Sequence, residues 1–384
     1  MIRDPETLTL LLDTIARFVR EKLVPAEAHV AETDQIPQGI VQDMKDLGLF
    51  GMSIPEAYGG MGLTMEEEVM AGFEIARTSP AFRSLFATNN GIGAQGIVLD
   101  GTDAQKQHYL PRIATGDIIG SFALTEPDSG SDAASVRTTA IRDGDSYVIN
   151  GTKRYITNAP EAGIFTVMAR TDVQKKGADG ISAFIVEKGT PGLSLGAIDK
   201  KMGQKGAHTC DVIFENVRIP AANLIGGEEG VGFKTAMKVL DKGRLNIAAA
   251  SVGAAQRMLA DALRYATERK QFGKPIGEFQ LIQAMLADSH AEIYAAHCMV
   301  IDAARKRDEG KNVGTEAACA KMFASEMCGR VADRAVQIFG GAGYLTEYGI
   351  ERFYRDVRLF RIFEGTTQIQ QLVIARNLLR EAAY

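Results

Sequence analysis

The sequence changes its pattern twice, near residue 118 and again past residue 227, and this limits most strongly how the chain can fold. Between these points, short runs rich in Val, Ile, Thr, Phe and Tyr alternate with the dipeptides Asp143-Gly144 and Asn150-Gly151, which tolerate positive φ and favour tight hairpins. No helix of useful length fits between the runs, so a parallel nucleotide-binding sheet is not expected. The predicted strands of this antiparallel β-domain lie at 138–142, 146–149, 153–157, 164–170, 181–187 and 210–217, the first three forming a meander.

The parts on either side predict helices. Asp4 is a suitable N-cap with Pro5 at the first helical position, and apolar residues then recur at helical spacing. Glycine-rich breaks at 58–62 and 89–93 are expected to separate the first helices. The last part holds long segments that are apolar around much of the helix, which is typical of a bundle or a subunit interface. The predicted helices lie at 38–47, 65–78, 103–113, 233–267, 280–306, 315–338 and 366–379.

The predicted fold class is therefore α+β, in three domains. We expect an N-terminal helical domain over residues 1–117, a central β-domain over 118–227 and a C-terminal helical bundle over 228–384. With 384 residues, of which 46% are hydrophobic, the chain has ample apolar surface for such cores.

Composition excludes several classes of protein. The 43 Lys and Arg residues are outnumbered by 48 Asp and Glu, so nothing indicates the basic face that nucleic-acid binding needs. The four cysteines lack CxxC spacing, and neither a disulfide framework nor a metal site is expected. The N-terminus lacks the apolar core of a signal peptide, and no apolar run is long enough to cross a membrane. We therefore expect a cytoplasmic enzyme.

Two loops carry residue types suited to binding or catalysis. Residues 125–132 place hydroxyls, acids and glycine directly after an apolar strand, where they can bind a polar planar ring or a phosphate. In residues 361–368, Glu364 stands between an apolar side chain and Gly365, and Thr366 is a suitable N-cap for the last helix. A carboxylate in apolar surroundings has a raised pKa and can act as a general base. The residues alone leave open a solvated turn for the first loop and a solvated capping acid for the second.

With four further motifs, these loops resemble the acyl-CoA dehydrogenase family of flavoproteins, over nearly the whole chain and in the family's order. The motifs lie at 51–62, 124–127 with 130–132, 155–158, 268–274 with Gln280, 337–343 and 363–370. The resemblance implies an N-terminal helical domain, a central antiparallel β-domain and a C-terminal four-helix bundle. It also implies a homotetramer built as a dimer of dimers, non-covalent FAD, and conversion of an acyl-CoA to the trans-2-enoyl-CoA, with electrons passed to an electron-transfer flavoprotein.

The resemblance also implies how the chemistry is divided. Glu364 is the base that removes the α-proton, and the β-hydrogen leaves as hydride to flavin N5. The thioester oxygen is expected to accept hydrogen bonds from the backbone N–H of the base and from a flavin ribityl hydroxyl, which form an oxyanion hole. Isovaleryl- and long-chain-type members carry the base at the position of Gly243, which cannot take a proton. The likeness is therefore to short- and medium-chain-type members, whose base lies in the C-terminal loop.

Cofactor and substrate contacts follow from the resemblance position by position. The implied FAD contacts are Phe122, Leu124, Thr125, Gly130, Ser131, Tyr155, Ile156, Thr157, Arg269, Phe272, Gln280, Gln337, Gly340, Gly341, Thr366 and Gln368. In the family, Arg269, Phe272 and Gln280 reach FAD across a dimer interface, and many members have tryptophan at the position of Tyr155. The implied substrate contacts are Ser131, Asp241, Arg244 and Gly365, with a helix-surface ion pair between Asp241 and Arg244 as the alternative.

Three other functions stay open at this point. An acyl-CoA oxidase-like enzyme would use oxygen as acceptor, and a flavin monooxygenase-like member would not need Glu364. A non-catalytic member of the fold would have lost its base or its flavin loops, and the sequence keeps both. For the dehydrogenase, we expect a short- to medium-chain or short branched acyl group.

Overall fold

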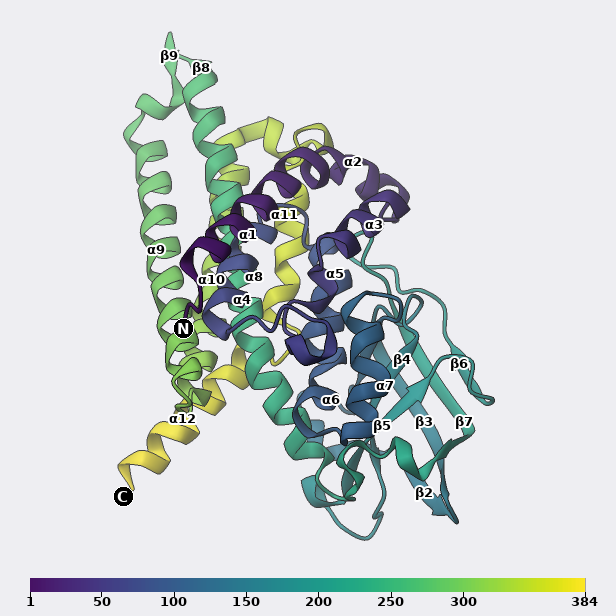
Figure 1. Ribbon diagram of the computed structural model, residues 1–384. Helices are drawn as coiled ribbons and strands as arrows, with labels where there is room; N and C mark the ends of the chain where they lie inside the picture. Colours follow the sequence, from purple (N-terminus) through teal and green to yellow (C-terminus); the bar gives the residue numbers. More distant parts are fainter. Residues whose placement is uncertain (384) are drawn as a thin grey trace.

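The computed structural model describes residues 1–383, in which a helical N-terminal part, a β-sheet and a set of long helices follow one another along the chain (Figure 1). This arrangement confirms the predicted α+β fold class. The predicted domain boundaries stay a prediction. Within residues 1–383, no helix combines the length and the apolar character that crossing a membrane requires.

The first helix begins as the capping rules predict. Asp4 accepts hydrogen bonds from the backbone N–H groups of Glu6 and Thr7, and Pro5 is the first helical residue. The helices of the N-terminal part are α1 (Pro5–Phe18), α2 (Val24–Thr33), α3 (Gln38–Asp46), α4 (Met65–Ile75), α5 (Pro80–Thr88), α6 (Gln95–Asp100) and α7 (Asp103–Ala114).

The predicted glycine-rich break at 89–93 is wrong. Asn89–Gly93 forms one π-helical turn that continues directly from α5. The buried Asn89 amide donates hydrogen bonds to the carbonyls of Phe50 and Ile113, and its oxygen accepts one from the N–H of Gly120. One asparagine therefore joins this turn to the start of the sheet.

The central part is a seven-stranded sheet with strand order β1-β4-β2-β3-β7-β6, in which β5 also pairs with β4. Its strands are β1 (Gly120–Ala123), β2 (Thr139–Asp143), β3 (Ser146–Thr157), β4 (Ile164–Arg170), β5 (Ile181–Glu187), β6 (Leu193–Leu195) and β7 (Thr209–Pro220). The pairs β2–β3, β3–β7, β4–β5 and β6–β7 are antiparallel, as expected. The pairs β1–β4 and β2–β4 are parallel, which the sequence did not predict.

The predicted hairpin at Asn150-Gly151 is also wrong, because β3 runs through both residues. Gly151 has a φ of 149° and lies at a register shift against β7. A Cβ there would lie 2.4 Å from the Thr138 hydroxyl oxygen. Glycine is therefore needed for close approach inside a strand, as at a β-bulge.

The C-terminal part is built around one long helix. Its helices are α8 (Gly232–Glu268), α9 (Gln280–Asp308), α10 (Gly314–Phe339), α11 (Ile350–Val357) and α12 (Thr367–Ala382), and the short strands β8 (Lys270–Gln271) and β9 (Lys274–Pro275) join α8 to α9. Every residue from 247 to 255 on α8 is buried. These residues are mostly small, and a Cβ on Gly253 would lie 2.3 Å from the carbonyl oxygen of Phe73 on α4. Small residues thus let helices from both ends of the chain pack closely.

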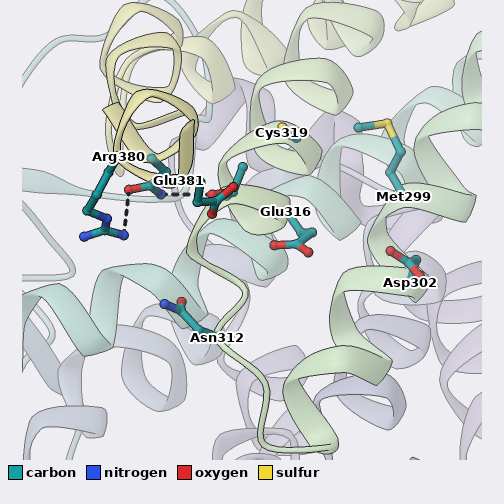
Figure 2. Close-up of a pocket in the computed structure, with 9 residues that line it drawn as sticks. Met299, Asp302, Asn312, Glu316, Cys319, Arg380 and Glu381 are labelled. Carbon is teal, nitrogen blue, oxygen red and sulfur yellow. Dashed lines mark hydrogen bonds between the residues drawn. The ribbon is translucent and has the colours of Figure 1, made fainter. Parts of the chain in front are cut away.

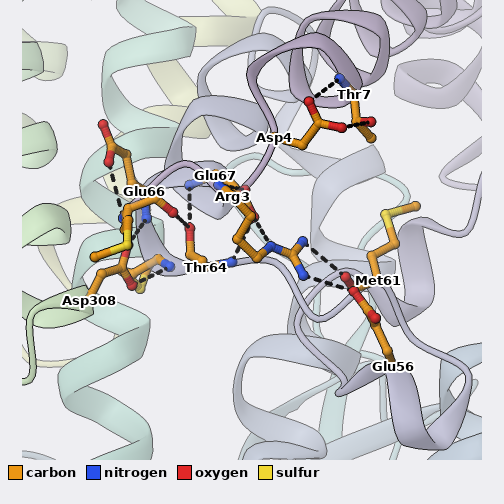
Figure 3. A network of polar contacts seen from close by, with 11 residues as sticks. Arg3, Asp4, Thr7, Glu56, Met61, Thr64, Glu66, Glu67 and Asp308 are labelled. Atoms are coloured by element: carbon orange, nitrogen blue, oxygen red, sulfur yellow. Dashed lines mark hydrogen bonds and ion pairs between the residues drawn. The ribbon is translucent and has the colours of Figure 1, made fainter.

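A polar network fixes the N-terminus against this core (Figure 3). Arg3 donates to Glu67 on α4 through its backbone N–H at 2.8 Å and its Nε at 2.9 Å. Asp308, the last residue of α9, accepts hydrogen bonds from the N–H groups of Met65 and Glu66. A carboxylate is favourable there because a helix N-terminus carries partial positive charge.

Candidate active site

A cavity of about 1140 Å³ opens where α5, the ends of β1 and β3, α8 and the loop before α12 meet. The predicted site residues that line it are Phe122, Leu124, Thr125, Gly130, Ser131, Tyr155, Ile156, Thr157, Arg244, Glu364, Gly365 and Thr366. Sites for one drug-sized ligand measure about 300–1,000 Å³. At about 1140 Å³ the cavity lies just above this range.

Glu364 lies in the turn that precedes α12. Its φ of 50° and the φ of 91° at Gly365 put both residues in the left-handed region. The Oε2 atom of Glu364 is buried and has no hydrogen-bond partner. Burial raises the pKa of Glu364, because the charged form loses its hydration. The carboxylate is thus not a solvated capping acid, and Thr366 caps α12 instead by accepting from the N–H of Ile369.

Three positively charged side chains oppose the effect of burial on the pKa of Glu364. Burial has the largest effect and raises the pKa of Glu364. The positive charges of Arg83 on α5, Lys321 on α10 and Arg244 on α8 each lower this pKa by less. The cavity wall as a whole is cationic, with seven basic residues against four acidic ones. Its basic residues are Arg83, Lys200, Lys201, Arg244, Arg355, Arg358 and Arg376. Such a wall suits ligands that carry phosphate groups.

Gly243 on α8 faces the carboxylate directly. A Cβ on Gly243 would lie 2.2 Å from Oε2 of Glu364. A side chain at 243 and the observed position of the Glu364 carboxylate therefore exclude each other.

The ends of β1 and β3 and the loop after β1 form another part of the cavity wall. The fully buried Lys153 on β3 donates to the carbonyl of Leu124 at 3.1 Å and to Glu126 at 2.7 Å. The N–H of Arg154 donates to the carbonyl of Thr125 at 2.8 Å. The predicted first loop is therefore attached to β3 by backbone and by a buried ion pair.

Arg244 and Asp241 lie one turn apart on α8 and form the ion pair that was the alternative to a substrate role. The Arg244 side chain is only 9% exposed, lines the cavity, and keeps its Nε without a partner. Asp241 is 38% exposed. The pair is therefore not a solvated surface pair: the aspartate orients a buried guanidinium at the cavity.

Three family models match the chain, described as the N-terminal domain of an acyl-CoA dehydrogenase at residues 5–117, its middle domain at 121–217 and its C-terminal domain at 230–379. The chain belongs to the acyl-CoA dehydrogenase family. It is accordingly an oxidoreductase, and members of this family are FAD-dependent flavoproteins.

Known relatives match nearly the whole chain. The human mitochondrial short-chain specific acyl-CoA dehydrogenase is 44% identical, over 98% of this chain and 91% of its own. A subunit of the caffeyl-CoA reductase-Etf complex of Acetobacterium woodii is 43% identical, over 97% of this chain and 98% of its own. The solved structure of butyryl-CoA dehydrogenase from Megasphaera elsdenii matches with a TM-score of 0.95 and 38% identity, covering 99% of this chain and all of that one.

The remaining predicted acyl-CoA dehydrogenase site residues do not line the cavity of their own chain. Arg269, Phe272 and Gln280 lie on or beside the β8–β9 hairpin at one end of the long helices (Figure 1). Phe272 is 92% exposed. The others are Gln337, Gly340 and Gly341 at the end of α10, Gln368 in the first turn of α12, and Asp241.

The ends of α8 and α10 nevertheless lie together. Tyr265, one turn before Arg269, stacks on Phe339 with 4.2 Å between ring centroids. The hairpin group and the group at the end of α10 therefore lie at the same end of these two helices, outside the cavity of Glu364. Their binding of FAD stays a prediction.

The residues at the cavity fit the cofactor of an acyl-CoA dehydrogenase. Phe122 and Ile156 offer apolar surface for a ring system, and Thr125 and Thr157 offer hydroxyls. The orphaned Nε of Arg244 and the cationic wall suit phosphate-bearing ligands. That these residues bind the flavin and the acyl-CoA stays a prediction.

Sequence reasoning missed Arg83, which lines the cavity, and the buried Lys153 and Lys321, which bind the backbone of the two predicted loops. A second cavity, of about 400 Å³ between α9, α10 and α12, contains none of the predicted site residues (Figure 2). Its polar lining includes Glu316, Asn377 and Arg380, and Asn377 donates to the Thr315 hydroxyl. Nothing in it resembles the buried carboxylate of the first cavity.

Proposed function

We propose that the protein converts an acyl-CoA to the trans-2-enoyl-CoA, with Glu364 as the base that takes the α-proton. The observation that carries the proposal is a buried carboxylate whose Oε2 has no hydrogen-bond partner, in a cavity of about 1140 Å³ that the predicted flavin-loop residues also line. An α-C–H group is a very weak acid, so a desolvated carboxylate with a raised pKa is a better base than a solvated one. FAD, when bound, supplies the acceptor for the β-hydride.

Residues of this chain supply the other requirements. The backbone N–H of Glu364 is a candidate donor to the thioester oxygen, where negative charge develops as the proton leaves. The turn that holds it is rigid, because Gly365 accepts hydrogen bonds from two buried side chains. Phe360 and Phe363, whose rings stack 5.9 Å apart, line the same cavity and make its wall apolar, which favours the exclusion of water.

The experiment replaces Glu364 by Gln, with Glu309→Gln as a control at the exposed end of α9. Purified wild-type protein should be yellow and should bleach anaerobically with an acyl-CoA. Glu364→Gln should keep its flavin and not bleach, while Glu309→Gln behaves as wild type. Full bleaching by Glu364→Gln would refute Glu364 as the base, and colourless wild-type protein would support the non-catalytic alternative.

The proposal also covers the electron acceptor and the direction of the reaction. We expect an electron-transfer flavoprotein as the partner, since one relative is named as a subunit of a reductase-Etf complex. That name also concerns reduction, and the same base can return a proton in the reverse direction by microscopic reversibility. Oxygen-driven turnover with peroxide formed at the turnover rate would instead favour an oxidase.

The second group of predicted cofactor residues supports a quaternary proposal. Arg269, Phe272, Gln280, Gln337, Gly340 and Gly341 would bind FAD of a partner chain, within a homotetramer built as a dimer of dimers. An exposed phenylalanine beside a guanidinium suits an aromatic, phosphate-bearing ligand better than it suits solvent. Arg269→Ala should lower the flavin content of the purified protein, and sedimentation should give the mass of a tetramer.

One observation favours a particular acyl group. Arg83 lines the cavity, and its Nη2 donates a long hydrogen bond of 3.3 Å to the carbonyl of Asn246. Burial lowers the pKa of Arg83, and the charges of Glu364 and Glu68 oppose this. A guanidinium has five donors, so most of them are available to a ligand. We therefore propose, as the second candidate beside a plain short acyl chain, an acyl group that ends in a carboxylate or another strong acceptor.

Comparison of matched substrates tests this candidate. The ratio of kcat/KM for a dicarboxylic acyl-CoA to that for the straight-chain acyl-CoA of equal length should exceed one. In Arg83→Met the ratio should fall about 10- to 100-fold, the value of a hydrogen bond to a charged group. Using the ratio cancels any effect of Arg83 on Glu364. An unchanged ratio would leave the unsubstituted short acyl chain as the substrate.

A further inference from the structure

A buried lysine binds the backbone next to the base. Lys321 lies on α10 and has none of its surface exposed. Its Nζ donates a hydrogen bond of 2.6 Å to the carbonyl oxygen of Gly365, the residue that follows Glu364. Burying an ammonium group is costly, and this one bonds to a neutral carbonyl instead of a carboxylate.

The same turn is held from a second side. The fully buried Gln370 donates from Nε2 to the carbonyl of Gly365 at 3.0 Å and to that of Glu364 at 3.4 Å. A Cβ on Gly365 would lie 2.4 Å from this Nε2, and the φ of 91° also requires glycine. The turn is thus fixed between α10 and α12, and only the lysine adds charge.

We propose that Lys321 is a positioning residue for Glu364: its ammonium holds the Gly365 carbonyl in the left-handed turn, and its positive charge favours the carboxylate form of the base. The proposal rests on the proposed function of Glu364. Lys321 makes two contributions that can be measured separately. Its hydrogen bond orders the turn, whereas its charge acts across space on the carboxylate of Glu364.

Charges on every side take part in this balance. Glu364 on the turn and Glu326 on α10 favour the charged lysine, and Arg244 on α8 opposes it. Burial, the largest effect, lowers the pKa of Lys321 to about 8, so the ammonium form predominates at neutral pH. Arg83 and Arg244 also face Glu364, so the loss of Lys321 removes one of three cations.

The experiment compares Lys321→Met, which keeps length without charge or donor, with Lys321→Arg, which keeps both. Arg330→Met is the matched control, since Arg330 lies on the same helix and pairs with Glu292 outside the cavity. Three quantities are measured on FAD-loaded protein: kcat and KM for an acyl-CoA, the acid limb of the pH profile of kcat/KM, and hydrogen exchange of a peptide covering 358–370.

For Lys321→Met we expect kcat to fall up to about 10²-fold, the effect of misplacing a reacting group by about 1 Å, with a much smaller change in KM. Amide exchange in the turn should accelerate on the order of tenfold, the value of one hydrogen bond. The acid limb should move to higher pH, because one cation that favours the carboxylate is gone. Lys321→Arg should retain an acid limb close to that of wild type, and Arg330→Met should match wild type in all three.

An acid limb that stays in place in Lys321→Met, together with unchanged exchange in the turn, would overturn the proposal. If this variant loses its flavin or unfolds, Lys321→Gln provides the same test with a second neutral side chain. A wild-type protein without acyl-CoA activity would refute the function proposed for Glu364, whereas the exchange measurement would still decide whether Lys321 fixes the turn.

Discussion

Gly243→Ala is the sharpest test of the geometry around the base, because activity and stability should respond in opposite directions. The added Cβ would lie 2.2 Å from Oε2 of Glu364 and 3.6 Å from Cγ2 of Ile92. Ordinary contact begins near 3.4 Å, so the Glu364 carboxylate must retreat by about 1.2 Å. Ile92 is already at an ordinary contact distance from the added Cβ and can stay in place. The obstructing atom is the end of a flexible side chain, so the fold should tolerate the change.

The expected magnitudes follow from this displacement. Moving a reacting group by about 1 Å costs about 10²-fold in rate, so kcat/KM for an acyl-CoA should fall by that order. Replacing glycine by alanine inside a helix stabilises it by about 0.5–1 kcal/mol, so the midpoint of thermal unfolding should hold or rise. Turnover with an artificial electron acceptor and thermal unfolding of the same flavin-loaded sample measure both effects.

Gly329→Ala on α10 is the matched control, since the nearest atom to its added Cβ is Cδ of Arg361 at 3.8 Å. It should gain similar stability and keep full activity. Retention of wild-type kcat/KM by Gly243→Ala would refute the reasoning, because the observed position of the carboxylate would then not matter to the reaction. A large loss of stability in Gly243→Ala would also refute the reasoning, because it would show that the turn with Glu364 cannot move away from the added Cβ.

Two further outcomes follow from buried charges elsewhere in the chain. Lys153→Met should destabilise the protein by about 3–5 kcal/mol and lower its flavin content, because it leaves Glu126 buried without its partner. Unfolding in urea measures the stability, and the flavin-to-protein absorbance ratio measures the flavin content. A Lys153→Met/Glu126→Gln double variant should recover part of the stability. Burial raises the pKa of Asp356 to about 6 from an ordinary 3.8, so its contribution to stability is full below pH 3.8 and is lost as the pH rises to about 6. Urea unfolding of Asp356→Asn should therefore lack the decline that wild type shows across this window, and parallel curves would contradict the assignment.

Much of the fold could be predicted because its signals are local. Asp4 and Thr366 cap helices where the sequence indicates, and the long C-terminal helices begin and end within a few residues of prediction. The errors arose where tertiary contacts decide. Asn150-Gly151 is a good hairpin dipeptide, but Thr138 lies so close to Gly151 that the glycine serves a bulge inside β3.

The site likewise contains residues that the sequence indicates and residues that only the structure shows. Glu364 could be proposed as the base from the sequence because its motif is contiguous, and the structure adds its burial at the cavity. Lys153 and Lys321 gave no signal, since a lysine in a sequence is most simply interpreted as exposed. Each is fully buried because a carbonyl from a distant segment accepts its hydrogen bond. Only the folded chain brings these partners together.

The arrangement around Glu364 also explains why its cations act at a distance. A guanidinium bonded directly to the carboxylate would lower the pKa of Glu364 strongly and occupy the lone pairs that must receive a proton. Here Arg244 is directed to Asp241 and Lys321 to the Gly365 carbonyl, and Oε2 remains without a hydrogen bond. The positive charges thus help to keep a buried carboxylate ionised, while the atom that would accept the α-proton is left free for the substrate.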